Sequence, residues 1–300
     1  MDSSRRHFLK TTSAATAAVW AGSSLPILAK KQPAMKARFE ISLAQWSLHR
    51  ALNKRTLSNL DFPKYTKDTF GIHAVEYVNL FFKKHAKDKA YLKDLKTRTD
   101  GEGIRNVLIM CDGEGPLGAP KKETRTQTVN NHKKWVEAAK LLGCHSIRVN
   151  AAGSGSHEEH AKYAADGLHA LSSFAKGFGI NVIVENHGGL SSNGTWLSGV
   201  LKSVNLSNCG ALPDFGNFGD YDRYQGIKDL MPYAKGVSAK SHAFDEQGNE
   251  TSTDFFKAMK IVAASNYKGY IGVEYEGGKL SENDGIRATK KLLELSFAKI

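Results

Sequence analysis

The chain has 300 residues, of which 41% are apolar and 24% charged, proportions that are ordinary for a globular protein. They exclude a disordered chain, a collagen-like repeat and a small disulfide scaffold. The net charge is +12, but residues 1–38 carry seven basic residues against Asp2 and so hold half of it. The remaining positive field is weak, and no nucleic-acid partner is expected. Cys111, Cys144 and Cys209 lack CxxC spacing, which argues against a disulfide framework and a zinc knuckle.

The N-terminus carries a short basic motif. The run Ser4-Arg5-Arg6-His7-Phe8-Leu9-Lys10 precedes a mildly apolar stretch, Thr11 to Ala29, rich in Ala, Ser, Thr and Gly. It resembles a twin-arginine export signal, which implies a periplasmic or otherwise exported protein handled by the twin-arginine translocation machinery. A stable membrane span needs about 20 strongly apolar residues, so we expect none in this chain. We therefore expect a signal over residues 1–29, a short linker over 30–39 and one domain over 40–300.

From residue 41 onward, short apolar or β-branched runs alternate with longer stretches of helical period. Strands are predicted over residues 41–48, 74–79, 104–111, 146–151, 180–186, 209–215, 235–241 and 270–275. Helices are predicted between them, including 124–142, 158–177 and 253–265, and glycines such as Gly71 and Gly143 fit left-handed helix C-caps. Eight strand–helix units in about 260 residues predict an α/β fold, the (β/α)8 TIM barrel. A doubly wound open sheet is the alternative, but no G-x-G-x-x-G follows the first strand.

Polar residues gather at the ends of the predicted strands, where a barrel places its chemistry. Four consecutive strands end in Glu185, in Asp214, in Lys240 with His242, and in Glu274. A carboxylate that follows an apolar run is costly to bury unless it is paired or bound to a metal. The pattern predicts an oxygen-rich metal site with one imidazole, suited to Mn²⁺, Mg²⁺, Co²⁺ or Zn²⁺.

Other strand-end residues are candidates for contacts with a substrate. These are Gln45, Trp46, Glu76, Asn150 and Asn217. His187 lies two residues beyond Glu185, on the same strand face, where it can pass a proton to a hydroxyl group. Each residue also has a structural interpretation, such as a salt bridge, a loop cap or ordinary barrel packing.

Three motifs carry a resemblance to a known family: V-E-N-H-G-G over 184–189, P-D-F-G-N-F over 213–218 and Y-K-G-Y-I-G-V-E-Y-E-G over 267–277. The chain resembles the sugar phosphate isomerase/epimerase group of xylose isomerase-like barrels over roughly residues 40–298. The resemblance implies a divalent metal held by Glu185, Asp214, a strand-seven ligand and Glu274. It also implies proton transfer beside a carbonyl through an enediolate. Glu185 and Glu274 would be the proton-transferring pair, assisted by Lys240 and His187.

The seventh strand departs from the family pattern. The usual run is H-x-K, but here Ser238 stands two residues before Lys240. We expect His242 to complete the metal site and Lys240 to face the substrate, because alternate strand residues share a face. The alternative is a site with three protein ligands and His242 on a solvent-side loop. Asn217 also stands where epimerases of this group often have a second histidine.

The leading interpretation is therefore a metal-dependent isomerase or epimerase acting on an unphosphorylated sugar or a keto-sugar derivative. Two alternatives remain open. One is a lyase or dehydratase of the same fold that acts by β-elimination. The other is a non-catalytic carbohydrate-binding barrel with a degenerate metal site, as Ser238 would permit. The expected partner is a small-molecule sugar, and the chain can also form a homo-oligomer.

Overall fold

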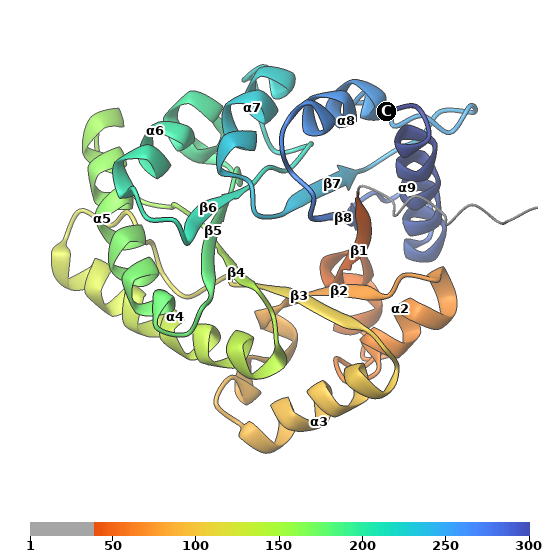
Figure 1. The fold of residues 1–300 in the computed structure, drawn as a ribbon, viewed down its shortest axis with the longest axis horizontal. Helices are drawn as coiled ribbons and strands as arrows, with labels where there is room; N and C mark the ends of the chain where they lie inside the picture. Colours follow the sequence, from red (N-terminus) through yellow and green to blue (C-terminus); the bar gives the residue numbers. More distant parts are fainter. Residues whose placement is uncertain (1–38) are drawn as a thin grey trace, which may run out of the picture. The chain divides into compact units, whose positions relative to one another are not determined.

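The computed structural model describes residues 39–300, so the expected export signal at 1–29 and the linker up to residue 38 lie outside the described residues. Within the described part, eight parallel strands form one curled sheet with helices around it, as Figure 1 shows. This arrangement confirms the predicted TIM barrel. The strands are β1 (Glu40–Ala44), β2 (Ala74–Val78), β3 (Arg105–Met110), β4 (Ser146–Val149), β5 (Asn181–Glu185), β6 (Cys209–Leu212), β7 (Val237–Ser241) and β8 (Tyr270–Tyr275).

The strand order shows how the barrel closes. The sheet runs β6-β5-β4-β3-β2-β1-β8-β7, with parallel pairing throughout. The two ends of this order, β6 and β7, meet through isolated bridges, one of which joins Asp214 to Ser238. Pro213 has no amide hydrogen to give to a ladder. Its carbonyl instead accepts from Ser238 N at 2.9 Å, and Ser238 O accepts from Phe215 N at 3.0 Å.

Helices follow the strands on the outside of the barrel (Figure 1). They are α1 (His49–Asn53), α2 (Phe62–Phe70), α3 (Lys89–Gly101), α4 (Lys122–Leu142), α5 (His157–Lys176), α6 (Gly194–Val204), α7 (Arg223–Leu230), α8 (Phe255–Ala264) and α9 (Glu282–Phe297). Four short 3-10 turns join them: η1 (Gln45–Leu48), η2 (Asn79–His85), η3 (Gly189–Ser192) and η4 (Met231–Tyr233). The predicted helices are confirmed to within two residues, and Gly143 ends α4 with a left-handed φ of 77°. None of the helices within residues 39–300 is long and apolar enough to cross a bilayer.

The apolar core has two parts. The larger part fills the space between strands and helices and is centred on large buried side chains such as Trp135 and Phe62. The smaller part lies inside the barrel and includes Ala44, Leu108 and Leu212. Because alternate strand residues share a face, the next inward position after Leu212 is Asp214. The apolar interior therefore gives way to a polar layer at the carboxyl ends of the strands.

The first strand is shorter than predicted, since β1 ends at Ala44 and η1 follows. Side chains of η1 replace the missing strand. Gln45 Oε1 accepts from the backbone amide of Val78 in β2 at 2.9 Å. On the other side, Ser47 Oγ donates to Val273 O at 3.2 Å and accepts from Tyr275 N at 2.9 Å in β8. Gln45 and Ser47, which were predicted to lie at the end of a strand, thus extend the hydrogen bonding of β1 with β2 and with β8 through their side chains.

We predict that Ser47→Ala lowers the free energy of unfolding by about 1–3 kcal/mol, because it leaves two buried backbone groups of β8 without partners. Urea denaturation of both proteins measures the difference. The matched control is Ser203→Ala, an exposed position on α6 that bonds only within its own helix. An equal loss in the two variants would contradict the proposed role of Ser47.

Candidate active site

Three carboxylates converge at the carboxyl ends of the strands. Glu185 ends β5, Asp214 follows β6 and Glu274 lies near the end of β8. Within residues 39–300, one oxygen from each lies within 4.8 Å of the others, and all three side chains are buried. We call these residues the acidic triad. The sequence placed all three at strand ends, and the structure brings them together.

Asp214 is held rigidly by its neighbours. Its backbone amide and carbonyl bond to the side-chain amide of Asn186, at 2.7 and 3.1 Å. Its Oδ1 accepts from the backbone amides of Gly216 at 2.7 Å and Asn217 at 2.9 Å. Asn217 also donates through Nδ2 to Glu185 Oε1 at 2.9 Å. The loop after β6 therefore fixes the positions of two triad carboxylates at once.

Ser238 takes the place where the family pattern has a histidine. Its Oγ lies 2.7 Å from Asp214 Oδ2 and 2.7 Å from Glu274 Oε2. A hydroxyl has one proton to donate, so both contacts are hydrogen bonds only when one carboxyl group is protonated. Burial raises the pKa of Asp214 to about 7, against the lowering effect of Lys240, and the nearby Glu185 and Glu274 add to the rise. Protonation of Asp214 near neutral pH would allow Ser238 to bond both carboxyl groups at once.

Lys240 reaches into the middle of the triad. Its Nζ lies 3.8 Å from Glu185 Oε1, 3.7 Å from Asp214 Oδ2 and 3.8 Å from Glu274 Oε1. A fourth carboxylate, Glu276, lies at 3.2 Å and is partly exposed at the barrel mouth. Burial alone would lower the pKa of Lys240, but the surrounding carboxylates raise it well above its ordinary value. The lysine is thus an ammonium ion and not a nucleophile.

Arg148 on β4 is a site residue that the sequence analysis missed. Its Nη1 donates to Asp112 Oδ1 at 2.7 Å, and its Nε lies 2.8 Å from Glu185 Oε2. The Nε–H does not point at that oxygen, so Glu185 Oε2 has no hydrogen bond among residues 39–300. Asn150 also donates to Asp112, at 2.8 Å. The available signal was the inward alternation of Arg148 with Asn150 along one strand.

The donor chemistry of the triad fits a divalent cation. Three buried carboxylates meet with oxygens close together, and Glu185 Oε2 is left without a hydrogen bond in the described chain. Buried carboxylates arranged in this way require positive charge nearby. With Ser238 in place of the imidazole, the donors are oxygens only, a set that suits hard ions such as Mg²⁺ and Mn²⁺.

Glu76 lies within the barrel, close to the triad but not part of it. It is buried, and Ser42 Oγ donates to its Oε1 at 2.6 Å. A Cβ added to Gly272 of β8 would lie 2.7 Å from Glu76 Oε1, so the glycine makes room for this carboxyl group. Burial raises the pKa of Glu76 to about 8; the Ser42 hydrogen bond lowers it, and the charge of Glu274 raises it further. Glu76 is therefore mostly protonated at pH 7, and its Oε2 has no hydrogen-bond partner among residues 39–300.

The structure does not bring His242 or His187 into the triad. His242 follows the end of β7 with an exposed side chain, and its backbone amide bonds to Glu250 at 3.2 Å. That bond and the turn after Ser241 direct the chain away from the barrel axis. His187 is exposed and lies near enough to Asp112 to lower the pKa of that group, whose main stabilising partner is Arg148.

Gln45 and Trp46, both predicted to contact a substrate, differ in how accessible their side chains are to a ligand. Gln45 is buried, with its Nε2 bonded to Asn59 at 2.8 Å and its Oε1 bonded to β2, so neither end of the amide is open to a ligand. Trp46 is half-buried and stacks on His49, with ring centres 4.9 Å apart. Its ring centre lies 6.0 Å from that of Phe81. These rings form an aromatic surface next to β1 and β2.

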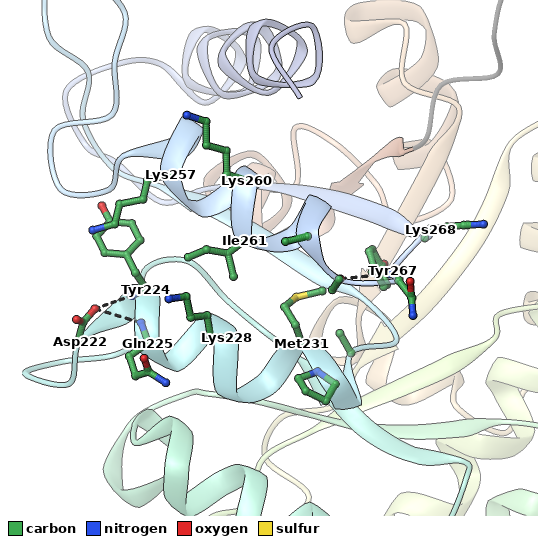
Figure 2. A pocket seen from close by; sticks show the side chains of 16 residues that line it. Asp222, Tyr224, Gln225, Lys228, Met231, Lys257, Lys260, Ile261, Tyr267 and Lys268 are labelled. Carbon is green, nitrogen blue, oxygen red and sulfur yellow. Dashed lines mark hydrogen bonds between the residues drawn. The ribbon is translucent and has the colours of Figure 1, made fainter.

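A surface groove of about 970 Å³ lies elsewhere, between α7, η4 and α8 on the outside of the barrel (Figure 2). Its lining includes Met231 and Ile261 together with four exposed lysines, Lys228, Lys257, Lys260 and Lys268. None of the triad carboxylates lines it. Its lining holds one carboxylate, Asp222, among these lysines, so the groove is a separate feature from the acidic barrel mouth.

Fold and site together define the class: a (β/α)8 barrel with an acidic centre at the carboxyl ends of its strands. The chain belongs to the Xylose isomerase-like TIM barrel family, whose model matches residues 65–295. Solved structures of sugar isomerases and epimerases are among those with a similar fold. A structure of the IOLI protein with a bound zinc atom has a TM-score of 0.69 at 16% identity, and the match covers 87% of this chain and 99% of that one. The 3-keto-D-glucoside 4-epimerase of E. coli, in its apo form, has a TM-score of 0.66 at 16% identity, covering 87% and 100%.

One curated relative matches over a short segment. It is the C-glycoside deglycosidase alpha subunit of Arthrobacter globiformis, 36% identical over 66 residues. The match covers 21% of this chain and 19% of that protein. The chain thus matches about a fifth of this relative's length.

We predict that Glu76 makes the apo protein less stable as the pH rises. Between its ordinary pKa of 4.5 and about 8, the folded state holds a proton that the unfolded state releases. Stability then falls by up to about 1.4 kcal/mol for each pH unit in this window. Glu76→Gln keeps an acceptor for Ser42 and removes the titration, so its unfolding free energy should fall less between pH 5 and pH 8. Urea denaturation in EDTA measures both slopes, and identical slopes would contradict the assignment.

Proposed function

We propose that this protein is a metal-dependent isomerase or epimerase acting on a sugar or keto-sugar derivative. The observation that carries the proposal is the buried triad of Glu185, Asp214 and Glu274 at the mouth of a barrel of this family. The similar fold of sugar epimerases supports the same reaction class, although identities of 12–16% establish the fold only. The chemistry is proton transfer at a carbon beside a carbonyl, through an enediolate.

The triad would hold the metal, with Mg²⁺ or Mn²⁺ favoured over Co²⁺ or Zn²⁺ because the donors are oxygens. When bound, the ion supplies Lewis-acid polarisation of a substrate carbonyl or hydroxyl oxygen. His242 is left out of this donor set, since its side chain is exposed. Asn217 fixes the Oε1 atom of Glu185 and so limits how that carboxylate can turn.

Glu185 and Glu274 are our candidates for moving the proton. They approach the centre from β5 and β8, which lie on different sides of the barrel mouth (Figure 1). One carboxylate can take a proton from the substrate carbon while the other returns it. Lys240 can donate a hydrogen bond to a substrate oxygen, and His187 can exchange a proton with a hydroxyl at the rim.

The rim of the site has the two kinds of surface that a sugar needs. On the β1–β2 side, Trp46 offers an aromatic face to the C–H groups of a sugar ring. On the β3–β6 side, Asn150, Asn217 and Asp112 offer polar groups to its hydroxyls. We therefore assign Trp46, Asn150 and Asn217 to substrate binding. We leave out Gln45, whose amide bonds within the protein, and Glu76, whose side chain is buried.

A lyase that acts by β-elimination is the second candidate. The segment similar to a C-glycoside deglycosidase alpha subunit favours it. Elimination begins with the same proton removal as isomerisation, so the same pair of carboxylates serves both reactions. Product analysis of a keto-sugar panel by NMR in D₂O separates them. An epimerase gives a deuterated isomer, whereas a lyase releases the group beside the reacting carbon.

We predict that Glu185→Gln and Asp214→Asn lose stoichiometric binding of Mn²⁺, because each removes a charged donor from the triad. Deuterium exchange at the reacting carbon should fall by a factor of about 10² to 10⁴ in Glu185→Gln. Elemental analysis and NMR in D₂O make the two measurements. Glu158→Gln, at an exposed position on α5, is the control and should retain both properties. Full metal content in both triad variants would refute the metal site, and a metal-free wild type would favour a non-catalytic sugar-binding barrel.

We also propose that the protein is exported through the twin-arginine route, with Arg5 and Arg6 as the recognition pair. We predict that replacing both arginines by lysine leaves the precursor in the cytoplasm, because the guanidinium groups are not reproduced by ammonium groups. Cell fractionation followed by immunoblotting measures the distribution. The control replaces Lys30 and Lys31 by arginine, which keeps the charge outside the motif. Normal periplasmic accumulation of the double lysine variant would defeat the proposal.

A further inference from the structure

The position of Lys240 has a consequence for the metal. Its Nζ lies at nearly the same distance, 3.7–3.8 Å, from one oxygen of each triad carboxylate. The side chain is 2% exposed, so water does not screen it. The ammonium group therefore already supplies the positive charge that the triad would otherwise take from a metal ion.

Two cations cannot share this ring of carboxylates at low cost. A buried site has a low effective dielectric constant, and like charges a few ångströms apart repel strongly there. The same carboxylates that attract a divalent ion also hold Lys240. Ser238 makes the metal ion a weaker competitor of the Lys240 ammonium group. Its hydroxyl bonds Asp214 and Glu274, and the site has no imidazole at this position that would bind a metal but not an ammonium ion.

Glu276 holds the ammonium group at the outer side of the triad. Lys240 Nζ donates a hydrogen bond to Glu276 Oε1 at 3.2 Å, closer than any triad oxygen, and the Glu276 side chain is 26% exposed. Glu276 follows the end of β8 and lies at the barrel mouth, beyond the triad. The four-carbon stem of lysine is flexible, and a small rotation can bring its charge toward Glu276 and away from the triad.

We propose that Lys240 is an exchangeable internal counter-ion of the metal site. While it is hydrogen-bonded to Glu276 it also neutralises the triad when no divalent ion is bound, and it withdraws from the triad toward Glu276 when one enters. This inference rests on the proposed metal site. It implies that the protein keeps its folded structure without metal and binds metal reversibly, at an affinity set by how easily Lys240 leaves.

A double-mutant cycle tests the proposal with Mn²⁺ as the probe. Binding is measured from the electron paramagnetic resonance signal of free Mn²⁺ for the wild type, Lys240→Met, Glu276→Gln and the double variant. Lys240→Met should bind Mn²⁺ at least about tenfold more tightly, because the competing charge is gone. Glu276→Gln should bind several-fold more weakly, because Lys240 has lost the carboxylate that holds its charge on the outer side of the triad.

The double variant separates two roles of Glu276. If Glu276 acts by receiving Lys240, its replacement has little effect once Lys240 is methionine. If it acts only as another negative charge near the ion, its replacement weakens Mn²⁺ binding equally in both backgrounds, and the proposal is overturned. Lys228→Met, at an exposed position on α7, controls for the general loss of one positive charge and should leave Mn²⁺ binding unchanged.

Thermal unfolding gives a second readout that does not depend on activity. Lys240→Met leaves the buried triad without its cation, so its melting temperature in EDTA should fall below that of the wild type. Saturating Mn²⁺ should raise that temperature by more in Lys240→Met than in the wild type. If Lys240→Met does not fold without metal, Lys240→Gln replaces it in every measurement.

The outcomes distinguish this inference from the proposed function. Mn²⁺ binding by the wild type with equal or weaker binding in the Lys240 variants would overturn the counter-ion role alone. An absence of Mn²⁺ binding in all four proteins would overturn the metal site and the counter-ion role together. Tighter binding in Lys240→Met, with an effect of Glu276→Gln confined to the lysine-containing background, would support both.

Discussion

The structure depends on one electrostatic constraint, the burial of several carboxyl groups within a narrow barrel. The buried acids are Glu76, Glu185, Asp214 and Glu274, and the buried bases among them are Arg148 and Lys240. Ionising all four acids would leave two uncompensated negative charges away from water, at a cost of several kcal/mol each. Burial raises the pKa of Glu76 to about 8 and that of Asp214 to about 7, so protonation of either acid near neutral pH reduces this cost. Arg148 and Lys240 lie against the remaining carboxylates, and each also contacts a less buried acid, Asp112 or Glu276.

This charge balance also explains the hydrogen bonds that surround the acids. Ser42 places a hydroxyl against Glu76, and Ser238 places one between Asp214 and Glu274. Each hydroxyl can donate or accept as the carboxyl group beside it changes protonation. Gly272 leaves space for Glu76, and the backbone amides after Asp214 stabilise that carboxylate on the side away from Ser238. The polar contacts inside the barrel are therefore organised around the buried acids. The apolar residues of the barrel interior pack next to this polar layer.

Much of the fold was predictable from the sequence, because the hydrophobic pattern of a strand followed by a helix repeats eight times and glycines such as Gly71 and Gly143 mark several helix ends. The triad was predictable as well, since a strand that ends in a carboxylate places it at the same barrel edge as its neighbours. Arg148 escaped prediction because an arginine within a short strand looks the same whether it faces solvent or the barrel axis. His242 shares a strand face with Lys240, but the chain turns after Ser241, and a hydrogen bond from the His242 backbone amide to Glu250 fixes that turn. Such tertiary contacts of a loop leave no periodic signal.

The seventh strand shows how a barrel of this family can change its chemistry without changing its fold. Ser238 and Lys240 lie on the inward face of β7, with a hydroxyl where the family pattern has an imidazole and with the lysine of that pattern kept. Lys240 packs its stem against Gly216, where an added Cβ would lie 3.2 Å from the lysine Cγ and Cδ, so the loop after β6 makes room for the lysine. The strand order, the strand register and the triad are compatible with a histidine or with a serine at position 238. The identity of the cation at the barrel mouth is therefore decided by a few inward side chains, and family membership alone does not determine it.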